Sequence, residues 1–211
     1  MLQKFKESYA HLLDVPIAAF EQTGFVLYKT EKRNEPEWAS WIQMIWFFSI
    51  DTVLVCSVAP EYAKQAETIF EKCRSHPLLS ETWLAQAQSI TDGQEWVQCE
   101  LFYYPTQNPP LPMSQYTVER LRPGEPEADR LLRNFDGGVY VISDANGKLA
   151  SHAAVKKKGL LREIAVGTQP EYRQQGMGRA VVAYAVQEIL AQGYVPTYWP
   201  DSLHNKASYA L

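Results

Sequence analysis

The clearest alternation of apolar and polar positions lies between residues 160 and 193. Residues 160–166 are apolar and partly β-branched, which predicts a strand, and a polar loop follows over residues 167–175. Beyond the loop, apolar residues recur at the spacing of one helix face, i, i+3, i+4, i+7 and i+8. These residues are Val182, Ala185, Val186, Ile189 and Leu190. Gly193 stands where a glycine commonly ends a helix.

The residues before this stretch also predict regular elements. A strand is expected over residues 116–121, a helix over 126–135, and two strands over 138–143 and 148–155. The last two strands are joined by Asp-Ala-Asn-Gly, which is a strong hairpin signal. One more strand is expected over residues 195–199. The predicted order is therefore strand, helix, three strands, loop, helix and strand.

The first hundred residues predict a second set of helices and strands. Helices are expected over residues 2–13, 60–73 and 80–90, and strands over 25–28, 52–58 and 95–104. Ser80 is suited to cap the third of these helices at its N-terminus. Residues 38–46 fit a helical stripe and residues 45–49 also fit a strand, so periodicity leaves both alternatives open there.

A change of composition marks the predicted boundary between two domains. Four prolines fall between residues 105 and 112 with almost no charge, which predicts an extended, semi-rigid linker. We therefore expect an N-terminal α/β domain over residues 1–104, a linker over 105–115 and a second domain over 116–211. No motif in the first domain points to a particular chemistry.

The composition excludes several classes of protein. The chain is 46% apolar, which is ample for a packed core, and its net charge of −4 gives no electrostatic footprint for nucleic acid. Cys56, Cys73 and Cys99 lack metal-ligand spacing, which favours buried thiols in a reducing cytoplasm. No signal peptide or membrane-spanning run is recognisable. The lysines at 156–158 are interpreted as a solvated hairpin tip.

A strand that leads through a glycine-rich loop into a helix is a candidate anion site. The first N–H groups of a helix have no partner within it, and the helix dipole adds positive potential there. Gly176 and Gly178 allow close approach to the backbone, and Arg173 and Arg179 bracket the loop. The loop has neither the Walker A spacing nor the full G-x-G-x-x-G pattern. The alternative is that the glycines only cap the helix.

Residues 173–178 read Arg-Gln-Gln-Gly-Met-Gly. This segment resembles the [QR]-x-x-G-x-[GA] pyrophosphate loop of the GCN5-related N-acetyltransferase (GNAT) superfamily. The lead-in over residues 167–172 is similar to that of the FR47-like and glycine-N-acyltransferase-like branches. Asn205 and Ser208 stand where such families carry an Asn-x-x-Ser pair. The resemblance covers residues 116–211.

The resemblance implies a fold and a co-substrate. The fold is α/β (α+β), with a mixed, mostly antiparallel central sheet flanked by helices in the C-terminal half. The N-terminal α/β domain is interpreted as either independent or a diverged second GNAT-like half. Acetyl-CoA or another acyl-CoA is the implied co-substrate, and no metal is required. The implied contacts are Val166, Gly167 and Thr168 for the pantetheine arm, and Arg173, Gln174, Gln175, Gly176, Met177, Gly178 and Arg179 for the pyrophosphate, with Asn205 and Ser208 also in the cofactor site.

Two residues are candidates for removing a proton from the acceptor amine. Glu163 lies on the predicted central strand, where the resemblance places a catalytic carboxylate in some members. An ion pair with Arg162 or with a lysine of the preceding hairpin is equally open for Glu163. His152 lies on the neighbouring strand, and an imidazole titrates near neutral pH, although most histidines in such positions are structural. Tyr209 lies about one turn short of the position of a family tyrosine that protonates the departing thiolate.

The predicted function is N-acyl transfer from acyl-CoA to a small-molecule amine or an amino acid. A non-catalytic GNAT-like module that binds acyl-CoA or a partner is the alternative. The resemblance implies a further helix and then a Gly-Phe turn into a final strand, and neither is recognised in this sequence, which would leave a sheet edge open. We expect a strand from residues 1–112, or a second copy of the chain in a homodimer, to cover that edge. No nucleic-acid or membrane partner is expected.

Overall fold

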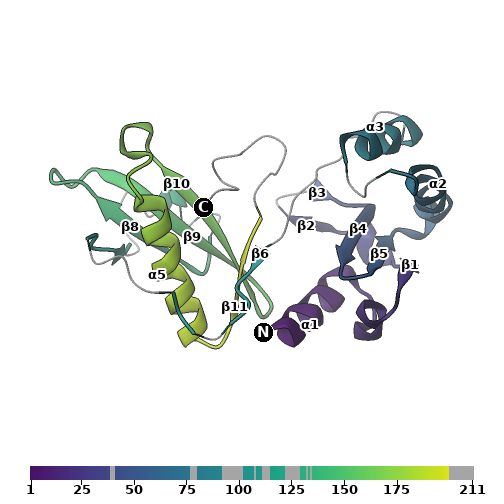
Figure 1. The fold of residues 1–211 in the computed structure, drawn as a ribbon, viewed down its shortest axis with the longest axis horizontal. Helices are drawn as coiled ribbons and strands as arrows, with labels where there is room; N and C mark the ends of the chain where they lie inside the picture. Colours follow the sequence, from purple (N-terminus) through teal and green to yellow (C-terminus); the bar gives the residue numbers. More distant parts are fainter. Residues whose placement is uncertain are drawn as a thin grey trace. The chain divides into compact units, whose positions relative to one another are not determined.

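The computed structural model describes residues 1–38, 41–76, 80–91, 102–106, 108–110, 115–121, 129–131, 133 and 135–199, without the side chains of residues 36–42 (Figure 1). Its contacts divide the chain into two units. One consists of Met1–Ser8 and Cys99–Leu211, and the other of Tyr9–Gln98. The division falls inside the first helix, α1 (Leu2–Leu13), which therefore contributes to both units. The limits predicted for the linker stay a prediction.

The first unit is built on a six-stranded sheet in the order β6-β11-β10-β9-β8-β7. Only β10 and β11 run parallel to each other, and the other neighbours are antiparallel. This confirms the expected mixed, mostly antiparallel sheet. The strands are β6 (Phe102–Tyr103), β7 (Glu119–Arg120), β8 (Gly138–Ser143), β9 (Leu149–Lys158), β10 (Leu161–Thr168) and β11 (Val195–Tyr198).

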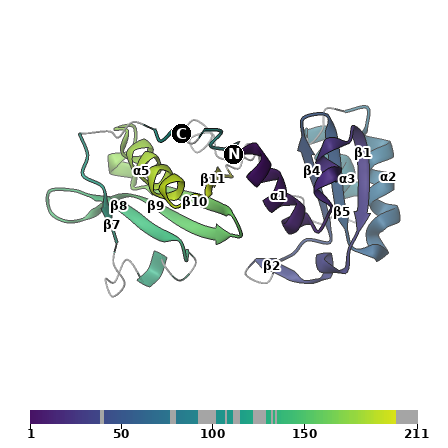
Figure 2. The ribbon, with the colours of Figure 1, turned by 90° about the horizontal axis from the view of Figure 1, so that it is seen from below.

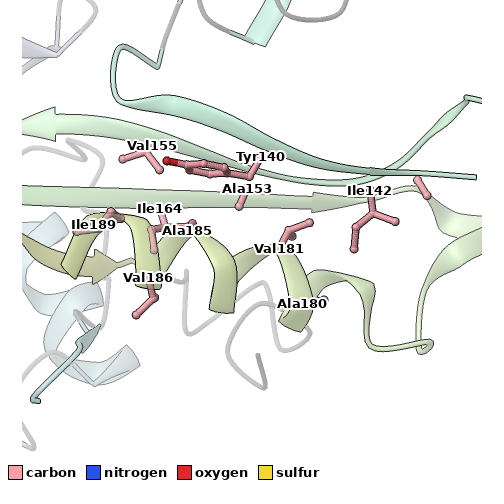
Figure 3. Close-up of a cluster of buried hydrophobic side chains, with 11 residues drawn as sticks. Tyr140, Ile142, Ala153, Val155, Ile164, Ala180, Val181, Ala185, Val186 and Ile189 are labelled. Atoms are coloured by element: carbon pink, nitrogen blue, oxygen red, sulfur yellow. The ribbon is translucent and has the colours of Figure 1, made fainter. Parts of the chain in front are cut away.

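The helix α5 (Met177–Ala191) covers one face of this sheet (Figure 2). Small and branched side chains fill the space between α5 and strands β8 to β10 (Figure 3). The buried face of α5 is formed by Ala180, Val181, Ala185, Val186 and Ile189. The buried face of α5 therefore differs from the predicted one, because Val182 and Leu190 are only half-buried. The small residues Ala180 and Ala185 let the helix lie close to the sheet.

The β8–β9 hairpin forms where its turn sequence predicted it. Asp144 accepts N–H bonds from Asn146 and Lys148 at 2.8 and 2.9 Å, and Gly147 has φ 78°. The interpretation of residues 156–158 as a hairpin tip was wrong. These lysines end β9, and the turn to β10 follows at Gly159, where φ is 56°. The Lys158 side chain is only 15% exposed.

The second unit contains a three-stranded sheet in the order β1-β5-β4, with β1 (Gly24–Lys29), β4 (Ile45–Ile50) and β5 (Val53–Val58). The strand alternative for residues 45–49 is thus the one that forms. β2 (Pro36–Trp38) and β3 (Trp41–Ile42) make a separate two-stranded sheet. Helices α2 (Ala63–Cys73) and α3 (Glu81–Ile90) follow, and Ser80 Oγ caps α3 by accepting from Trp83 N at 3.2 Å.

Successive side chains of β4 point to opposite faces of this sheet. Phe47 packs edge-on against Trp83 of α3, with ring centroids 5.3 Å apart. Phe48 stacks on Tyr9 of α1 at 4.5 Å and meets Phe20 of the short helix η1 (Ile17–Glu21). α2 and α3 therefore cover one face, and the end of α1 with η1 covers the other (Figure 2).

The last carbonyl groups of α1 are capped by side chains. Lys32 Nζ donates to His11 O at 2.7 Å, Arg33 Nη2 to Leu12 O at 2.7 Å, and Ser57 Oγ to Leu13 O at 2.5 Å. The last carbonyl groups of a helix have no N–H donor within the helix, so side chains can donate to them. Cations at this end also interact favourably with the helix dipole. This explains why Arg33 is almost fully buried in the second unit.

The sheet edge next to β11 is paired. β6 runs antiparallel to β11, with Tyr103 opposite Thr197, and Tyr104 N donates to Pro196 O at 3.1 Å. Phe5 of α1 stacks on Tyr103 at 4.6 Å, and Lys4 Nζ donates to Gly193 O at 2.9 Å. A strand from residues 1–112 therefore lies at this edge. This is one of the two arrangements expected from the sequence, the other being a strand from a second copy of the chain.

Candidate functional site

The loop between β10 and α5 contains two left-handed residues next to the N-terminus of the helix. After the short helix η4 (Pro170–Tyr172), Gln174 and Gly176 both take the left-handed conformation, at φ 61° and 84°. Turns that contain left-handed residues can form a concave nest of N–H groups that suits an anion. The first N–H bond within α5 is donated by Ala180 to Gly176 O at 3.0 Å. The N–H groups of residues 177–179 precede it and remain outside the helical ladder.

Hydrogen bonds within the loop fix its peptide groups. Tyr116 Oη donates to Gln175 O, and Gln175 Nε2 donates to Glu171 O at 3.2 Å. In a trans peptide the N–H points opposite to the C=O, so Tyr116 turns the Gly176 N–H away from itself. Arg173 Nε donates to Thr168 O at 3.2 Å, which leaves its two other guanidinium nitrogens for an anion.

Four side chains, which we call the brace, join the outside of this loop to the β8–β9 turn. Lys148 Nζ lies 2.6 Å from Glu171 Oε1, and Tyr172 Oη donates to Asp144 Oδ2 at 2.7 Å. The Tyr172 bond lowers the pKa of Asp144, and the Lys148 bond lowers the pKa of Glu171. The pKa of Lys148 is raised by Glu171 and that of Tyr172 by Asp144. All four shifts favour the bonded forms near neutral pH.

The sequence reasoning did not find Tyr116 or the brace. The β9–β10 register, with Ser151 opposite Thr168, is what places the turn over residues 144–147 next to the loop over residues 169–172. The tight turn at Gly159 could suggest this register. Predicting it still requires knowledge of how the two strands pair, which no local motif contains. Tyr116 lies 59 residues from its partner, and no local pattern marks it.

Within the described residues, one edge of β10 is paired over its whole length and the other is paired only at its start. β9 pairs with residues 161–168, whereas β11 pairs only with residues 161–163. Gln169 N donates to Ala150 O at 2.9 Å, so by alternation Ala165 and Gly167 bond toward β9, and Ile164 and Val166 direct their N–H and C=O to the other edge. We call the place where β10 and β11 separate, after Glu163 and Thr197, the fork.

Glu163 lies at the fork and is engaged by a lysine. Lys158 Nζ lies 2.6 Å from Glu163 Oε2, with 15% and 14% of the two side chains exposed. The same ammonium lies 4.4 Å from the centre of the Trp199 ring, which follows β11. Of the two interpretations of Glu163, the ion pair with a hairpin lysine is thus formed, while a role in proton transfer stays a prediction.

His152 lies on β9 directly opposite Gly167 of β10. A Cβ at residue 167 would overlap the imidazole, with Nε2 only 2.9 Å away, so the ring occupies the space that a side chain at residue 167 would need. Gly167 is four residues beyond Glu163, which is about 13 Å along a strand. The structure therefore does not bring the two candidate catalytic residues together.

Asn205 and Ser208 lie outside the described residues, as does Cys99, while Cys56 and Cys73 are buried free thiols.

Burial raises the pKa of both described thiols, which makes them unreactive. Across the described part of the chain, no group of three His, Cys, Asp or Glu side chains is arranged to hold a metal ion. Among the helices described, none has both the length and the apolar character needed to cross a membrane.

Three solved structures of GNAT proteins are similar to the chain. A putative acetyltransferase from Novosphingobium aromaticivorans is 21% identical over 44% of this chain and 47% of its own, with a TM-score of 0.38. A GCN5-related N-acetyltransferase-like protein from Streptococcus suis is 19% identical over 62% of both chains, with a TM-score of 0.41. A GCN5-related N-acetyltransferase from Sphaerobacter thermophilus is 14% identical over 72% of this chain and 64% of its own, with a TM-score of 0.47.

The chain thus spans between about half and two thirds of the length of these structures. No curated protein matches it significantly. The family model of the GNAT acetyltransferases matches residues 101–211, which is more than half of the chain and includes the loop, the open edge of β10 and α5. The chain therefore belongs to the acetyltransferase (GNAT) family.

Proposed function

We propose that the protein is an N-acyltransferase that moves an acetyl or other short acyl group from acyl-CoA to the amine of a small molecule or an amino acid. The observation that carries this proposal is the pair of left-handed residues, Gln174 and Gly176, at the N-terminus of α5, beside a strand edge to which no other described strand pairs from Ile164 onward. A nest of N–H groups and an unpaired strand edge suit a pyrophosphate followed by an amide-containing arm.

The parts of acyl-CoA have candidate partners on both features. The pyrophosphate would take the N–H groups of residues 177–179 and the exposed guanidinium groups of Arg173 and Arg179. The pantetheine amides would bond to the N–H and C=O of Val166 and approach Gly167 and Thr168. Gln174, Gln175 and Met177 would contribute backbone rather than side chains. Asn205 and Ser208 stay predicted members of the site.

Transfer to an amine requires that the amine be neutral when it attacks the thioester. Glu163 is the proposed acceptor of that proton because it lies at the fork, whereas His152 lies on β9 opposite Gly167, which is about 13 Å further along β10. The acceptor is proposed to be small because the net charge of −4 offers no surface for a polyanion. We also propose that the chain belongs to the FR47-like or glycine-N-acyltransferase-like branch. We further propose that the protein is cytoplasmic and forms a homodimer.

One observation favours the non-catalytic alternative. Glu163 is already held by Lys158, so a proton-accepting role requires that the pair change during the reaction. A module that only binds acyl-CoA would need no free carboxylate. Release of free thiol from acetyl-CoA with a panel of amines separates the two, since a binding module releases none.

The first test is calorimetric titration of the protein with acetyl-CoA and with free CoA. Gly176→Trp fills the nest and should weaken binding of both at least tenfold. The matched control is Gly193→Trp, at the other end of α5, because Gly193 also has a positive φ, 79°, and open space around it. Equal affinities of the two variants would show that Gly176 only caps the helix, and the proposal would fail.

A further inference from the structure

The fork holds an ammonium group that belongs to the chain itself. Lys158 Nζ is bound by the Glu163 carboxylate at 2.6 Å and lies 4.4 Å from the centre of the Trp199 ring. A carboxylate and an indole face are the two groups that recognise a primary ammonium most strongly. Lys158 thus presents a primary amine at the place where β10 and β11 separate.

The same place is where the acyl group of a bound acyl-CoA would lie. The open edge of β10 runs from Thr168, next to the pyrophosphate loop, back to Glu163 at the fork. Five residues of strand span about 17 Å, which is close to the reach of an extended pantetheine arm. An arm that starts at the loop and follows this edge therefore delivers its thioester beside Glu163 and Lys158.

We propose that Lys158 is itself an acyl acceptor, so that the protein acylates its own Lys158 from acyl-CoA. This inference rests on the proposed function, because it requires acyl-CoA to occupy the loop and the open edge. It assigns a modification site in addition to transfer to an external amine. The class of donor is a short-chain acyl thioester of CoA.

The step balances with the groups at hand. The Lys158 ammonium gives a proton to Glu163, and the neutral Nζ attacks the thioester carbonyl carbon. A C–N bond forms and the C–S bond breaks, and the CoA thiolate takes the proton that the attacking nitrogen then loses. Glu163 returns its own proton to solvent. The products are Nε-acyl-Lys158, free CoA and one proton, and no oxidant or metal takes part.

Burial makes this acylation distinguishable from spontaneous chemistry. Spontaneous acylation by a thioester favours exposed, solvated amines, and Lys157 is exposed whereas Lys158 is 15% exposed. Lys157 and Lys158 are adjacent on β9, so their side chains point to opposite faces of the sheet. Solvent accessibility alone would favour acylation of Lys157. Preferential acylation of Lys158 would therefore indicate that a bound acyl-CoA delivers the acyl group to this site.

The experiment is intact-mass measurement of the full chain incubated with acetyl-CoA, followed by peptide mapping. We expect one acetyl group per chain, at Lys158, to appear at least tenfold faster than at Lys157. Lys158→Arg keeps a cation for Glu163 and Trp199 but cannot be acylated in this way, and should abolish the fast addition. Lys157→Arg is the matched control and should leave it unchanged. Gly176→Trp should slow it at least tenfold.

Three other outcomes overturn the inference in different ways. Calorimetric binding of acetyl-CoA without selective addition at Lys158 would show that the lysine is only an ion-pair partner, and would leave the proposed function standing. Absence of acetyl-CoA binding would contradict the proposed function and this inference together. Addition that is spread over exposed lysines and is unaffected by Gly176→Trp would mark the acylation as spontaneous.

Discussion

Gly167 shows how a single residue can serve two neighbours at once. Its missing side chain leaves room for the imidazole of His152, which lies against it across the β9–β10 pair. At the same time it continues the strand edge that leads from Val166 to the loop. The glycine was assigned from sequence to a cofactor contact, and the structure adds a packing requirement that comes from the other strand.

Gly167→Ala should lower the free energy of unfolding by about 1–3 kcal/mol, the usual cost of overpacking. Gly167 has no positive φ, so the cost comes from the imidazole and not from backbone strain. Urea unfolding of the variant measures it. In the double variant Gly167→Ala with His152→Ala, part of the loss should be recovered, because the overlapping ring is gone. Equal losses in the single and double variants would contradict this account.

Residues whose role is set by the local backbone were the ones best predicted from sequence. Gly176 and Gly193 have the left-handed conformations that their places at the two ends of α5 require, and Ser80 caps α3 as expected. The partner of Glu163 stayed open between a catalytic and an ion-pairing interpretation. That choice depends on which side chains the β9–β10 register brings together, and no local spacing contains this information.

Among the elements, the loop after β10 depends on the β8–β9 turn through the brace of Asp144, Lys148, Glu171 and Tyr172. A flexible loop loses conformational entropy when it becomes ordered around a bound anion. A loop that is already fixed by the brace loses less, so binding is more favourable. Tyr172→Phe removes one brace bond without removing the ring. It should weaken acetyl-CoA binding several-fold in calorimetry, while Tyr184→Phe on α5, away from the brace, should not. Unchanged affinity of Tyr172→Phe would show that the brace does not order the nest.

The brace also has a defined pH dependence. The pKa values of Asp144 and Glu171 are lowered in the folded state, so their contribution to stability is present above the ordinary carboxyl range and is lost as the pH falls through the lowered values. Glu171→Gln should therefore be less stable than the wild type at pH 6, and the difference should vanish near pH 2.5. Chemical unfolding at both pH values measures it. A difference that persists at pH 2.5 would exclude the Lys148–Glu171 pair as its source.

Most strands and helices were predictable because their periodicity is local. α1, β1, β5, β8, β9 and β10 lie within a few residues of their expected positions. Residues 38–46 could not be decided, since an aromatic-rich run satisfies both a helical stripe and a strand. Pairing of β4 with β5 decides it over residues 45–50, and that pairing is a tertiary contact. The helix expected over residues 126–135 lies mostly outside the described residues.

At the scale of the whole molecule, β6 pairs with β11 although the two strands are some ninety residues apart. This pairing gives a partner to a strand edge that would otherwise be available for another chain. Tyr104→Pro removes the N–H that bonds to Pro196 O and should lower the melting temperature and increase light scattering on heating. Tyr104→Phe keeps that N–H and should behave as the wild type. Identical scattering by both variants would mean that β6 does not protect the edge.

The sharing of α1 between the two units has a consequence for folding during synthesis. Tyr9–Gln98 forms one compact unit, and all its residues have been made once Gln98 has emerged from the ribosome. Lys4, by contrast, bonds to Gly193, which is made 189 residues later. At 5–20 residues per second this delay is on the order of ten to forty seconds. The first turn of α1 is thus made long before its partner Gly193, and any chaperone that protects the nascent protein must leave this turn free until then.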